Sequence, residues 1–228
     1  MSSYMGDGEK NPSLTNTKNS VKEKHVRPDD IEKTSMKIID NELELMGIVI
    51  PEENYAVTRR VIHTTADFDY AVNLTFTDGA VKDAVKALVR SIPIVTDTNM
   101  TLAGISRPAM ERLGITTQCF MAEPRIRDLA REMGVTKAAA SQLYAARQLP
   151  GAVLSVGNAP TALLALEEEI GRGYMPELVI AVPVGFVNVV EAKERIMEAG
   201  VPFICSRGRK GGSNVAAAIV NAILYHMK

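Results

Sequence analysis

Apolar residues along this chain fall into short runs that alternate with longer segments of helical periodicity. The runs predict strands at residues 72–76, 92–96, 118–121, 153–156, 178–183 and 202–205. Between them, helical patterns span residues 79–90, 99–106, 125–148, 161–171, 188–198 and 214–227. Strands that alternate with helices favour a mostly parallel sheet covered by helices on both faces. We therefore expect the α/β class, as a three-layer α/β/α sandwich.

Two more helices are predicted ahead of the first strand. After Pro28, helical spacing links Ile31, Ser35, Ile38, Ile39, Leu43 and Met46, and Gly47 closes the helix. A second helix follows Pro51 and runs toward Thr65. Residues 1–27 are rich in Ser, Asn, Lys and Gly, with almost no large apolar side chains to bury. We expect a flexible polar tail over 1–27 and a single α/β domain over 28–228.

Composition and charge narrow the class of protein. The 228 residues are 46% hydrophobic and carry a net charge of -1, without the basic excess of a nucleic-acid binder. No apolar run approaches the roughly 20 residues of a membrane span, and the polar start lacks the hydrophobic core of a signal peptide. The sequence therefore predicts a cytoplasmic protein that binds neither membranes nor nucleic acid.

Cysteine and histidine usage gives no sign of a metal site. Cys119 and Cys205 lie inside apolar runs, which favours reduced, buried thiols over a disulfide. The three histidines, His25, His63 and His226, are scattered along the chain. We expect no bound metal ion.

The segment Ser206–Asn214 has the composition of an anion site. It places three cations, Arg207, Arg209 and Lys210, and three glycines between a predicted strand and an apolar helix. Glycines allow close backbone approach, and a helix start offers free N–H groups and partial positive charge. It is not a phosphate-binding P-loop, because Lys210 precedes the glycine pair. This basic loop, residues 206–214, predicts an acidic ligand.

Other strand-end turns point to the same edge of the sheet. They are Asp97-Thr98-Asn99, Gly157-Asn158-Ala159-Pro160-Thr161 and Pro183-Val184-Gly185-Phe186. Asn158 is predicted to cap the following helix, and Pro160 to leave neighbouring N–H groups free for a carboxylate. Ligands of such sheets bind outside the carboxyl ends of the strands, so we expect a shared pocket there. The alternative is that these turns only cap helices.

The second helix carries a candidate proton donor. Arg60 and His63, three residues apart, share one helical face and could reach a common ligand. Histidine can give or take a proton near neutral pH. The alternative is a packed histidine at the end of a helix.

Several motifs in a fixed order resemble one known family. They are Ser35 with Ile38-Ile39, Arg60-Val61-Ile62-His63, Pro93-Ile94-Val95-Thr96-Asp97, Gly157 to Leu163, Pro183 to Val187, and Val201-Pro202-Phe203 with Arg207 to Ser213. From Pro28 onward the chain resembles the precorrin-8X methylmutases, or precorrin isomerases, and their cobalt-precorrin-8 counterparts from cobalamin biosynthesis. One departure is Ala66, where a glycine commonly follows the histidine motif.

The resemblance implies a flavodoxin-like fold, a homodimer and an isomerase that needs no cofactor. It would move a methyl group of the macrocycle from C11 to C12, giving hydrogenobyrinate or, with cobalt, cobyrinate. His63 matches the proton donor that assists the [1,5]-sigmatropic shift, and Ser35 and Arg60 match substrate-binding positions. The substrate, a tetrapyrrole with several carboxylate arms, agrees with the predicted anion site. On physical placement we add Asn158, Gly185, Arg207 and Arg209 as substrate-binding residues.

Two other functions remain open at this point. Residues 126–148, with Gly134 in the turn and Thr136 as cap, look like a helix-turn-helix that binds DNA. Its second helix, however, is rich in alanine and offers little besides Lys137, Gln142 and Arg147 to read bases. A non-catalytic tetrapyrrole-binding protein is the other reading. The final helix, apolar on most faces, predicts either a dimer contact or burial within the monomer.

Overall fold

A single six-stranded sheet forms the centre of the molecule. The computed structural model describes residues 28–227, and the predicted tail, residues 1–27, lies outside them. The strands are β1 (Leu74–Phe76), β2 (Ile94–Thr96), β3 (Thr117–Gln118), β4 (Val153–Val156), β5 (Leu178–Ala181) and β6 (Phe203–Ser206). Their order is β1-β6-β5-β4-β2-β3, and β1 alone pairs antiparallel. The five parallel strands therefore follow the flavodoxin order, which confirms the expected fold class.

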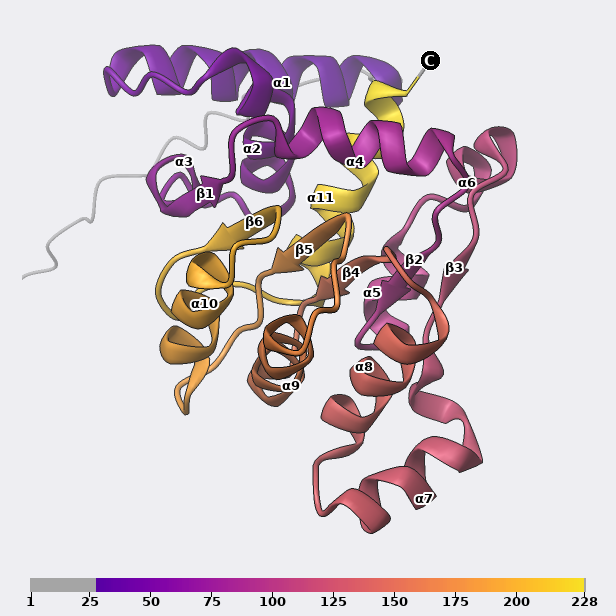
Figure 1. The fold of residues 1–228 in the computed structure, drawn as a ribbon. Helices are drawn as coiled ribbons and strands as arrows, with labels where there is room; N and C mark the ends of the chain where they lie inside the picture. Colours follow the sequence, from indigo (N-terminus) through magenta and orange to yellow (C-terminus); the bar gives the residue numbers. More distant parts are fainter. Residues whose placement is uncertain (1–27, 228) are drawn as a thin grey trace, which may run out of the picture.

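Helices cover both faces of this sheet (Figure 1). One layer contains α2 (Glu52–Thr65), α4 (Ala80–Val89), α5 (Asn99–Gly104), α6 (Arg107–Leu113) and α11 (Ser213–His226), with α1 (Pro28–Leu45) packed outside α2. The opposite layer contains α7 (Pro124–Met133), α8 (Lys137–Gln148), α9 (Pro160–Gly171) and α10 (Val189–Glu198). Two short helices complete the chain: α3 (Tyr70–Asn73) precedes β1, and the 3₁₀ helix η1 (Phe120–Ala122) follows β3.

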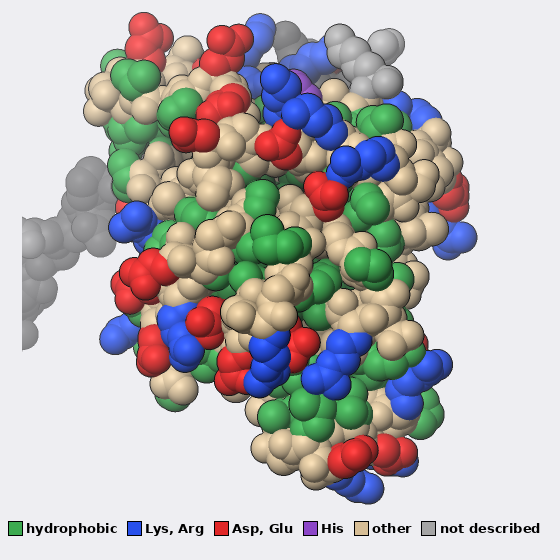
Figure 2. Space-filling view, viewed as in Figure 1, with side chains coloured by type: hydrophobic (Ala, Val, Ile, Leu, Met, Phe, Trp, Pro, Cys, Tyr) green, Lys and Arg blue, Asp and Glu red, His purple; other side chains and the backbone are tan. Residues whose placement is uncertain are grey.

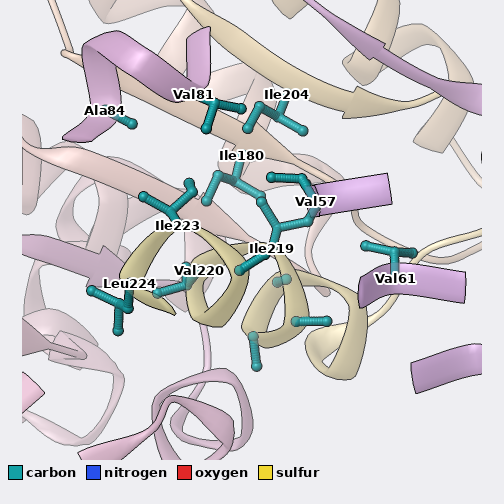
Figure 3. Packing of buried hydrophobic residues seen from close by; sticks show 14 of the residues in the cluster. Val57, Val61, Val81, Ala84, Ile180, Ile204, Ile219, Val220, Ile223 and Leu224 are labelled. Carbon is teal, nitrogen blue, oxygen red and sulfur yellow. The ribbon is translucent and has the colours of Figure 1, made fainter. Parts of the chain in front are cut away.

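Successive side chains of each strand point to opposite faces of the sheet, and this divides the core into two apolar clusters. Ile180 and Ile204 face the α2–α11 side, whereas Val179 and Cys205 face the α9–α10 side. Figure 3 shows Ile180 of β5 close to Ile219 and Ile223 of α11, with Val57 of α2 beside Ile219 and Ile204 of β6 beside Val81 of α4. Both faces of β4, β5 and β6 are buried, which explains why these strands read as continuous apolar runs.

The last helix is buried within the monomer. Residues 215–220 and 222–224 of α11 are all buried, and the helix packs mainly against α2 and α5. Of the two explanations for its apolar faces, burial within one chain is the correct one. Its composition therefore carries no argument for a dimer.

The helix-turn-helix segment packs against the core. Gly134 turns the chain with φ +65°, and the Thr136 hydroxyl accepts a hydrogen bond from the Ala139 N–H at 3.2 Å, as predicted. Ala140, Ala145 and Ala146 of α8 are buried in the cluster that includes α9. The alanines that left this helix poor in base-reading groups are thus packing residues. On the face shown in Figure 2, acidic and basic side chains are interspersed, without a continuous basic surface.

Several predicted boundaries differ from the observed ones. The run 72–76 begins as α3, and only Leu74–Phe76 is strand. The run 118–121 yields only the short β3, followed by η1, and α6 was not predicted. No helix within residues 28–227 has the length and apolar character needed to cross a membrane.

Candidate functional site

His63 and Ser35 line the same cavity. It has a volume of about 310 Å³ and lies between α1 and the end of α2. Ser35, Ile38, Ile39 and Glu42 come from α1, and Ile62, His63, Ala66 and Phe68 come from α2 and the turn after it. The walls are mostly apolar, with an imidazole, a hydroxyl and a carboxylate as the polar groups. The structure thus brings together the predicted proton donor and one predicted substrate-binding residue.

Packing and capping at the end of α2 fix the position of His63. Val57, Val61 and Ile62 are buried, so the adjacent His63 is turned toward α1 and is only half-buried. The helix ends at Thr65, and its C-cap residue Ala66 has φ +52° and donates its N–H to the Ile62 carbonyl at 2.7 Å. A left-handed conformation costs a residue with a side chain roughly 1–2 kcal/mol, which explains why glycine suits this position.

Arg60 lies beside this cavity but does not line it. Its guanidinium pairs with Glu32 at 2.8 Å and stacks 5.1 Å from the centre of the Tyr225 ring. It lines two neighbouring grooves, one of them with Asp40 and Arg59. Arg60 and His63 therefore face adjoining surfaces and do not share one pocket in this conformation.

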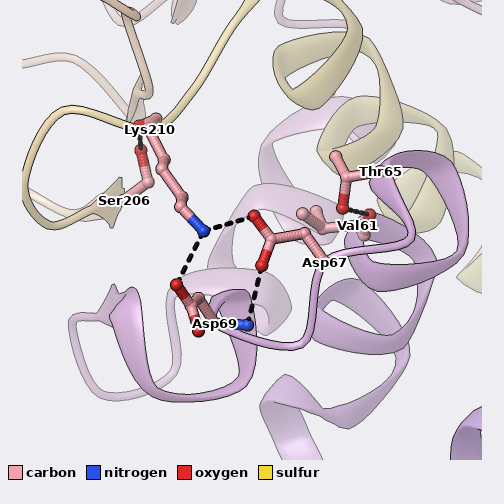
Figure 4. A network of polar contacts seen from close by, with 6 residues as sticks. All are labelled: Val61, Thr65, Asp67, Asp69, Ser206 and Lys210. Atoms are coloured by element: carbon pink, nitrogen blue, oxygen red, sulfur yellow. Dashed lines mark hydrogen bonds and ion pairs between the residues drawn. The ribbon is translucent and has the colours of Figure 1, made fainter.

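The basic loop is tied to the cavity wall by Lys210. Its ammonium donates to Asp67 at 2.5 Å and to Asp69 at 2.6 Å (Figure 4). The hydrogen bond from Lys210 lowers the pKa of Asp67, and both carboxylates raise the pKa of Lys210. Asp67 lies between Ala66 and Phe68, which line the His63 cavity. Lys210 therefore joins the basic loop to that cavity and is not a free cation.

Arg207 and Arg209 remain exposed at the same edge. Arg207 donates to the Thr75 hydroxyl at 3.0 Å, and Arg209 lies 5.5 Å from the centre of the Phe186 ring. The Gly185 N–H donates to the Arg209 carbonyl at 3.3 Å. Within residues 28–227, neither arginine has a carboxylate partner. The structure thus places Gly185 in contact with Arg209, whereas the Arg207 side chain is directed to β1, and both guanidinium groups are exposed.

A carboxylate of the protein occupies the turn after β4. Asp97, which is buried, accepts hydrogen bonds from the N–H groups of Gly157 at 3.0 Å, Asn158 at 2.8 Å and Ala159 at 3.0 Å. Burial raises the pKa of Asp97, and these three N–H groups oppose that rise. The N–H groups predicted to be free for a ligand are therefore already bound.

The role predicted for the Asn158 side chain as a helix cap is wrong. Ala159 is the N-cap of α9, and no side chain caps that helix. β2 and β4 flank the point where the strand order of a flavodoxin-like sheet reverses, which is where ligands commonly bind. Because Asp97 fills this position, the candidate site lies at the carboxyl ends of β5 and β6 and at the cavity between α1 and α2.

Gly211 of the basic loop and Gly157 of the turn after β4 allow close packing within the protein. A Cβ on Gly211 would overlap the Val182 carbonyl oxygen, and one on Gly157 would lie 2.9 Å from the Ala216 Cβ. The Gly212 N–H also donates to the Val182 carbonyl at 2.9 Å. The expectation that glycines allow close approach is right, but at these two positions the neighbour is the protein itself.

Sequence reasoning missed one buried cation under the basic loop. Lys193 of α10 is 1% exposed, and its ammonium donates to the Ser206 hydroxyl and to the carbonyls of Gly208 and Lys210. A detectable signal existed, because Lys193 falls on the helix face that also carries Val189, Ala192 and Ile196. Within the described residues, no group of three or more His, Cys, Asp or Glu side chains could hold a metal ion.

The structure is thus an α/β protein with a flavodoxin-like sheet, a cavity lined by His63, and two exposed arginines on the loop after β6. Residues 30–226 match the family model for precorrin-8X methylmutase. The chain belongs to the precorrin-8X methylmutase family.

Individual relatives agree with this assignment. A cobalt-precorrin-8 methylmutase from Salmonella typhimurium is 38% identical over 209 residues, which cover 89% of this chain and 97% of that protein. A precorrin-8X methylmutase from Pseudomonas aeruginosa is 38% identical over 199 residues, covering 85% and 93%. The solved precorrin-8x methyl mutase from Thermus thermophilus has a TM-score of 0.77 at 39% identity, covering 86% and 96%.

Proposed function

We propose that this protein is an isomerase of cobalamin biosynthesis that moves the C11 methyl group of precorrin-8X or cobalt-precorrin-8 to C12. The product is hydrogenobyrinate, or cobyrinate when cobalt is present. One observation carries the proposal: in a chain of this family, the cavity brings His63 and Ser35 together. In this proposal the shift is a rearrangement within one molecule and uses no cofactor.

His63 acts as the proton donor in this proposal. Its protonated imidazole donates a proton to a ring nitrogen, which alters the conjugated system and assists the [1,5]-sigmatropic shift. The imidazole takes a proton back after the shift, so substrate and product remain isomers. Ser35, across the cavity, hydrogen-bonds to the substrate, and the apolar wall residues contact the ring. Because the step is unimolecular, the protein contributes mainly a fixed orientation and a correctly placed proton.

The carboxylate arms extend beyond the cavity toward the basic loop. A volume of 310 Å³ is at the lower end of the range of about 300–1,000 Å³ for ligand pockets. It therefore holds only part of a macrocycle. The exposed Arg207 and Arg209 lie at the adjoining edge, where charge-assisted hydrogen bonds to carboxylates contribute roughly 1.5–3 kcal/mol each.

Three other predicted binding residues contribute less directly: Arg60, Gly185 and Asn158. Arg60 pairs with Glu32, so a carboxylate arm that binds Arg60 must replace this partner. Gly185 supports the Arg209 carbonyl through its N–H, which makes it a residue that shapes the site. The Asn158 backbone is bound to Asp97, but its exposed side chain is free to reach an arm.

The active protein is a homodimer in the cytoplasm in this proposal. An exposed stripe on α1, consisting of Ile31, Ile38 and Leu45 at intervals of seven residues, supports a contact with a second copy. Both cysteines are free thiols, in keeping with a reducing compartment.

An anaerobic absorption assay with precorrin-8X and, separately, cobalt-precorrin-8 tests the reaction, because the shift changes the chromophore. We expect wild type to convert at least one substrate, and His63→Ala to bind it without conversion. His226→Ala, which removes an exposed histidine at the end of α11, is the matched control and should retain turnover.

Two other outcomes of this assay would distinguish the alternative functions. Binding by wild type without conversion of either substrate would favour a non-catalytic tetrapyrrole-binding protein. Full turnover by His63→Ala would remove His63 from the mechanism and leave the isomerase assignment intact.

A further inference from the structure

A buried ammonium group lies directly beneath the basic loop. The Lys193 Nζ donates to the Ser206 hydroxyl at 3.1 Å, the Gly208 carbonyl at 2.9 Å and the Lys210 carbonyl at 2.8 Å. A lysine has three N–H donors, and all three are used here. Burying an unpaired charge is costly, so its presence under a loop needs a reason beyond solubility.

The contacts of Lys193 determine which groups of the loop face inward. The carbonyls of Gly208 and Lys210 flank Arg209 in sequence, and both bind the buried ammonium. The Ser206 hydroxyl donates to the same Lys210 carbonyl at 2.8 Å. Carbonyl oxygens carry partial negative charge and would repel a carboxylate. With two of them turned to Lys193, the exposed Arg209 side chain beside Phe186 faces solvent.

The same contacts continue to the His63 cavity. Lys210, whose carbonyl binds Lys193, uses its side chain to hold Asp67 and Asp69. Asp67 lies between two residues of the cavity wall, Ala66 and Phe68. Lys193 thus supports both the loop that carries the exposed arginines and the turn that borders the proton donor.

We infer that Lys193 is a positioning residue for substrate binding, holding the basic loop so that Arg207 and Arg209 meet the carboxylate arms. The inference rests on the proposed function. Lys193 touches no substrate in this arrangement, because its ammonium is fully used by the loop. It acts through the backbone of residues 206–210.

Steady-state kinetics of Lys193→Met with the substrate that wild type converts tests this role. We expect KM to rise about tenfold, as for loss of one charge-assisted contact, with kcat within about threefold of wild type. Hydrogen exchange should speed up at residues 207–212 and stay unchanged in the sheet. Arg195→Met is the matched control, since it removes a cation from the same helix that pairs with Glu167 at 2.8 Å, away from the loop.

An unchanged KM in a folded Lys193→Met variant would overturn the inference, as would an equal rise in Arg195→Met. If Lys193→Met does not fold, Ser206→Ala decides, because it removes one partner of Lys193 and one bond to the Lys210 carbonyl. We then expect KM to rise about threefold, and no change would overturn the inference. Failure of wild type to convert either substrate would instead overturn the proposed function.

Discussion

At the scale of single residues, Asp97 decides what the turn after β4 can bind. Its carboxylate takes three backbone N–H groups that would otherwise be open to a ligand. The sequence shows Asp97 and Gly157 as two separate strand-end turns, 60 residues apart. Nothing local to either segment indicates that they meet, so local patterns predicted a ligand where the structure has an internal contact.

Asp97→Asn should therefore destabilise the fold. An amide nitrogen would replace one carboxylate oxygen and face N–H donors, leaving at least one of them unpaired. Hydrogen bonds to buried charged groups contribute about 1.5–3 kcal/mol, so we expect the free energy of unfolding to fall by about 2–3 kcal/mol. Urea unfolding near neutral pH measures this change.

Asp128→Asn is the matched control for that substitution. Asp128 is an exposed residue of α7 that pairs with Arg127, and exposed pairs contribute little. We expect the control to stay within about 0.5 kcal/mol of wild type. Equal stability of both variants would mean that the Asp97 contacts do not hold the two turns together.

Lys193 predicts a measurable pH dependence of stability. Burial lowers the pKa of Lys193 to about 8, whereas an unfolded lysine titrates near 10.4. The titratable group beside it is the Cys205 thiol, whose pKa burial raises to about 12, so it stays protonated in this range. Between the two lysine pKa values the unfolded chain binds more protons than the folded one, and stability rises with pH.

The free energy of unfolding of wild type relative to Lys193→Met isolates this contribution. We expect the difference to move in favour of wild type by about 1 kcal/mol between about pH 8 and about pH 9. Urea titrations of both proteins across this window provide the measurement. A constant difference would show that Lys193 keeps an ordinary pKa in the folded state.

At the scale of elements, Lys210 couples the basic loop to the turn after α2. Lys210→Met would release Asp67 and Asp69 and loosen the wall that borders His63 (Figure 4). Because the pairs are partly exposed, global stability should change by less than about 1 kcal/mol. We expect faster hydrogen exchange at residues 66–70 and a lower kcat, read from exchange mass spectrometry and the absorption assay.

Lys86→Met tests whether these effects are specific. Lys86 forms an exposed ion pair with Asp83 at 2.7 Å on α4, so the Lys86→Met substitution removes a comparable ion pair away from the cavity. The control should leave both kcat and exchange at residues 66–70 unchanged. A Lys210→Met variant that behaves like this control would show that the ion pairs do not shape the cavity.

Sequence patterns located the elements best where a helix carries its own apolar periodicity or its own stop signal. The apolar faces of α2 and α11 and the break between α7 and α8 at Gly134 were all visible in the sequence. Val72 is different, because it begins an apolar run yet is exposed in α3. The strand starts only at Leu74, where pairing with Ser206 of β6 begins, and that partner is more than 100 residues away.

The candidate site, too, was predicted only in part from the sequence. His63 was proposed from the chemistry of histidine and its place on the helix, and Ser35 from the resemblance to a family. The cavity that both residues line is formed by the packing of α1 on α2. Arg60, three residues from His63, was expected to share that pocket, but Glu32 and Tyr225 hold it on a neighbouring surface. Helical spacing predicts which side chains are neighbours, and packing of the adjacent helices decides which cavity each one lines.

At the scale of the whole molecule, the exposed apolar surface of α1 indicates a contact with a second copy. This helix buries Ile39 and Leu43 against α2 but leaves Ile31, Ile38 and Leu45 exposed on a second stripe. The sequence left α11 either as a dimer contact or as a helix buried within the monomer, and the structure shows that the monomer buries it. The exposed stripe moves the expected contact between two copies to α1.

Sedimentation equilibrium tests this location. We expect wild type to sediment as twice the 24.7 kDa chain, and Ile31→Glu with Leu45→Glu to shift the population to monomer, because four charges would enter an apolar contact related by two-fold symmetry. Val89→Glu with Met175→Glu is the control, since these side chains are also exposed but lie outside α1, and it should remain dimeric. A monomeric wild type would leave the stripe uncovered and contradict the proposed dimer, whereas a dimer that survives both glutamates would place the contact on another surface.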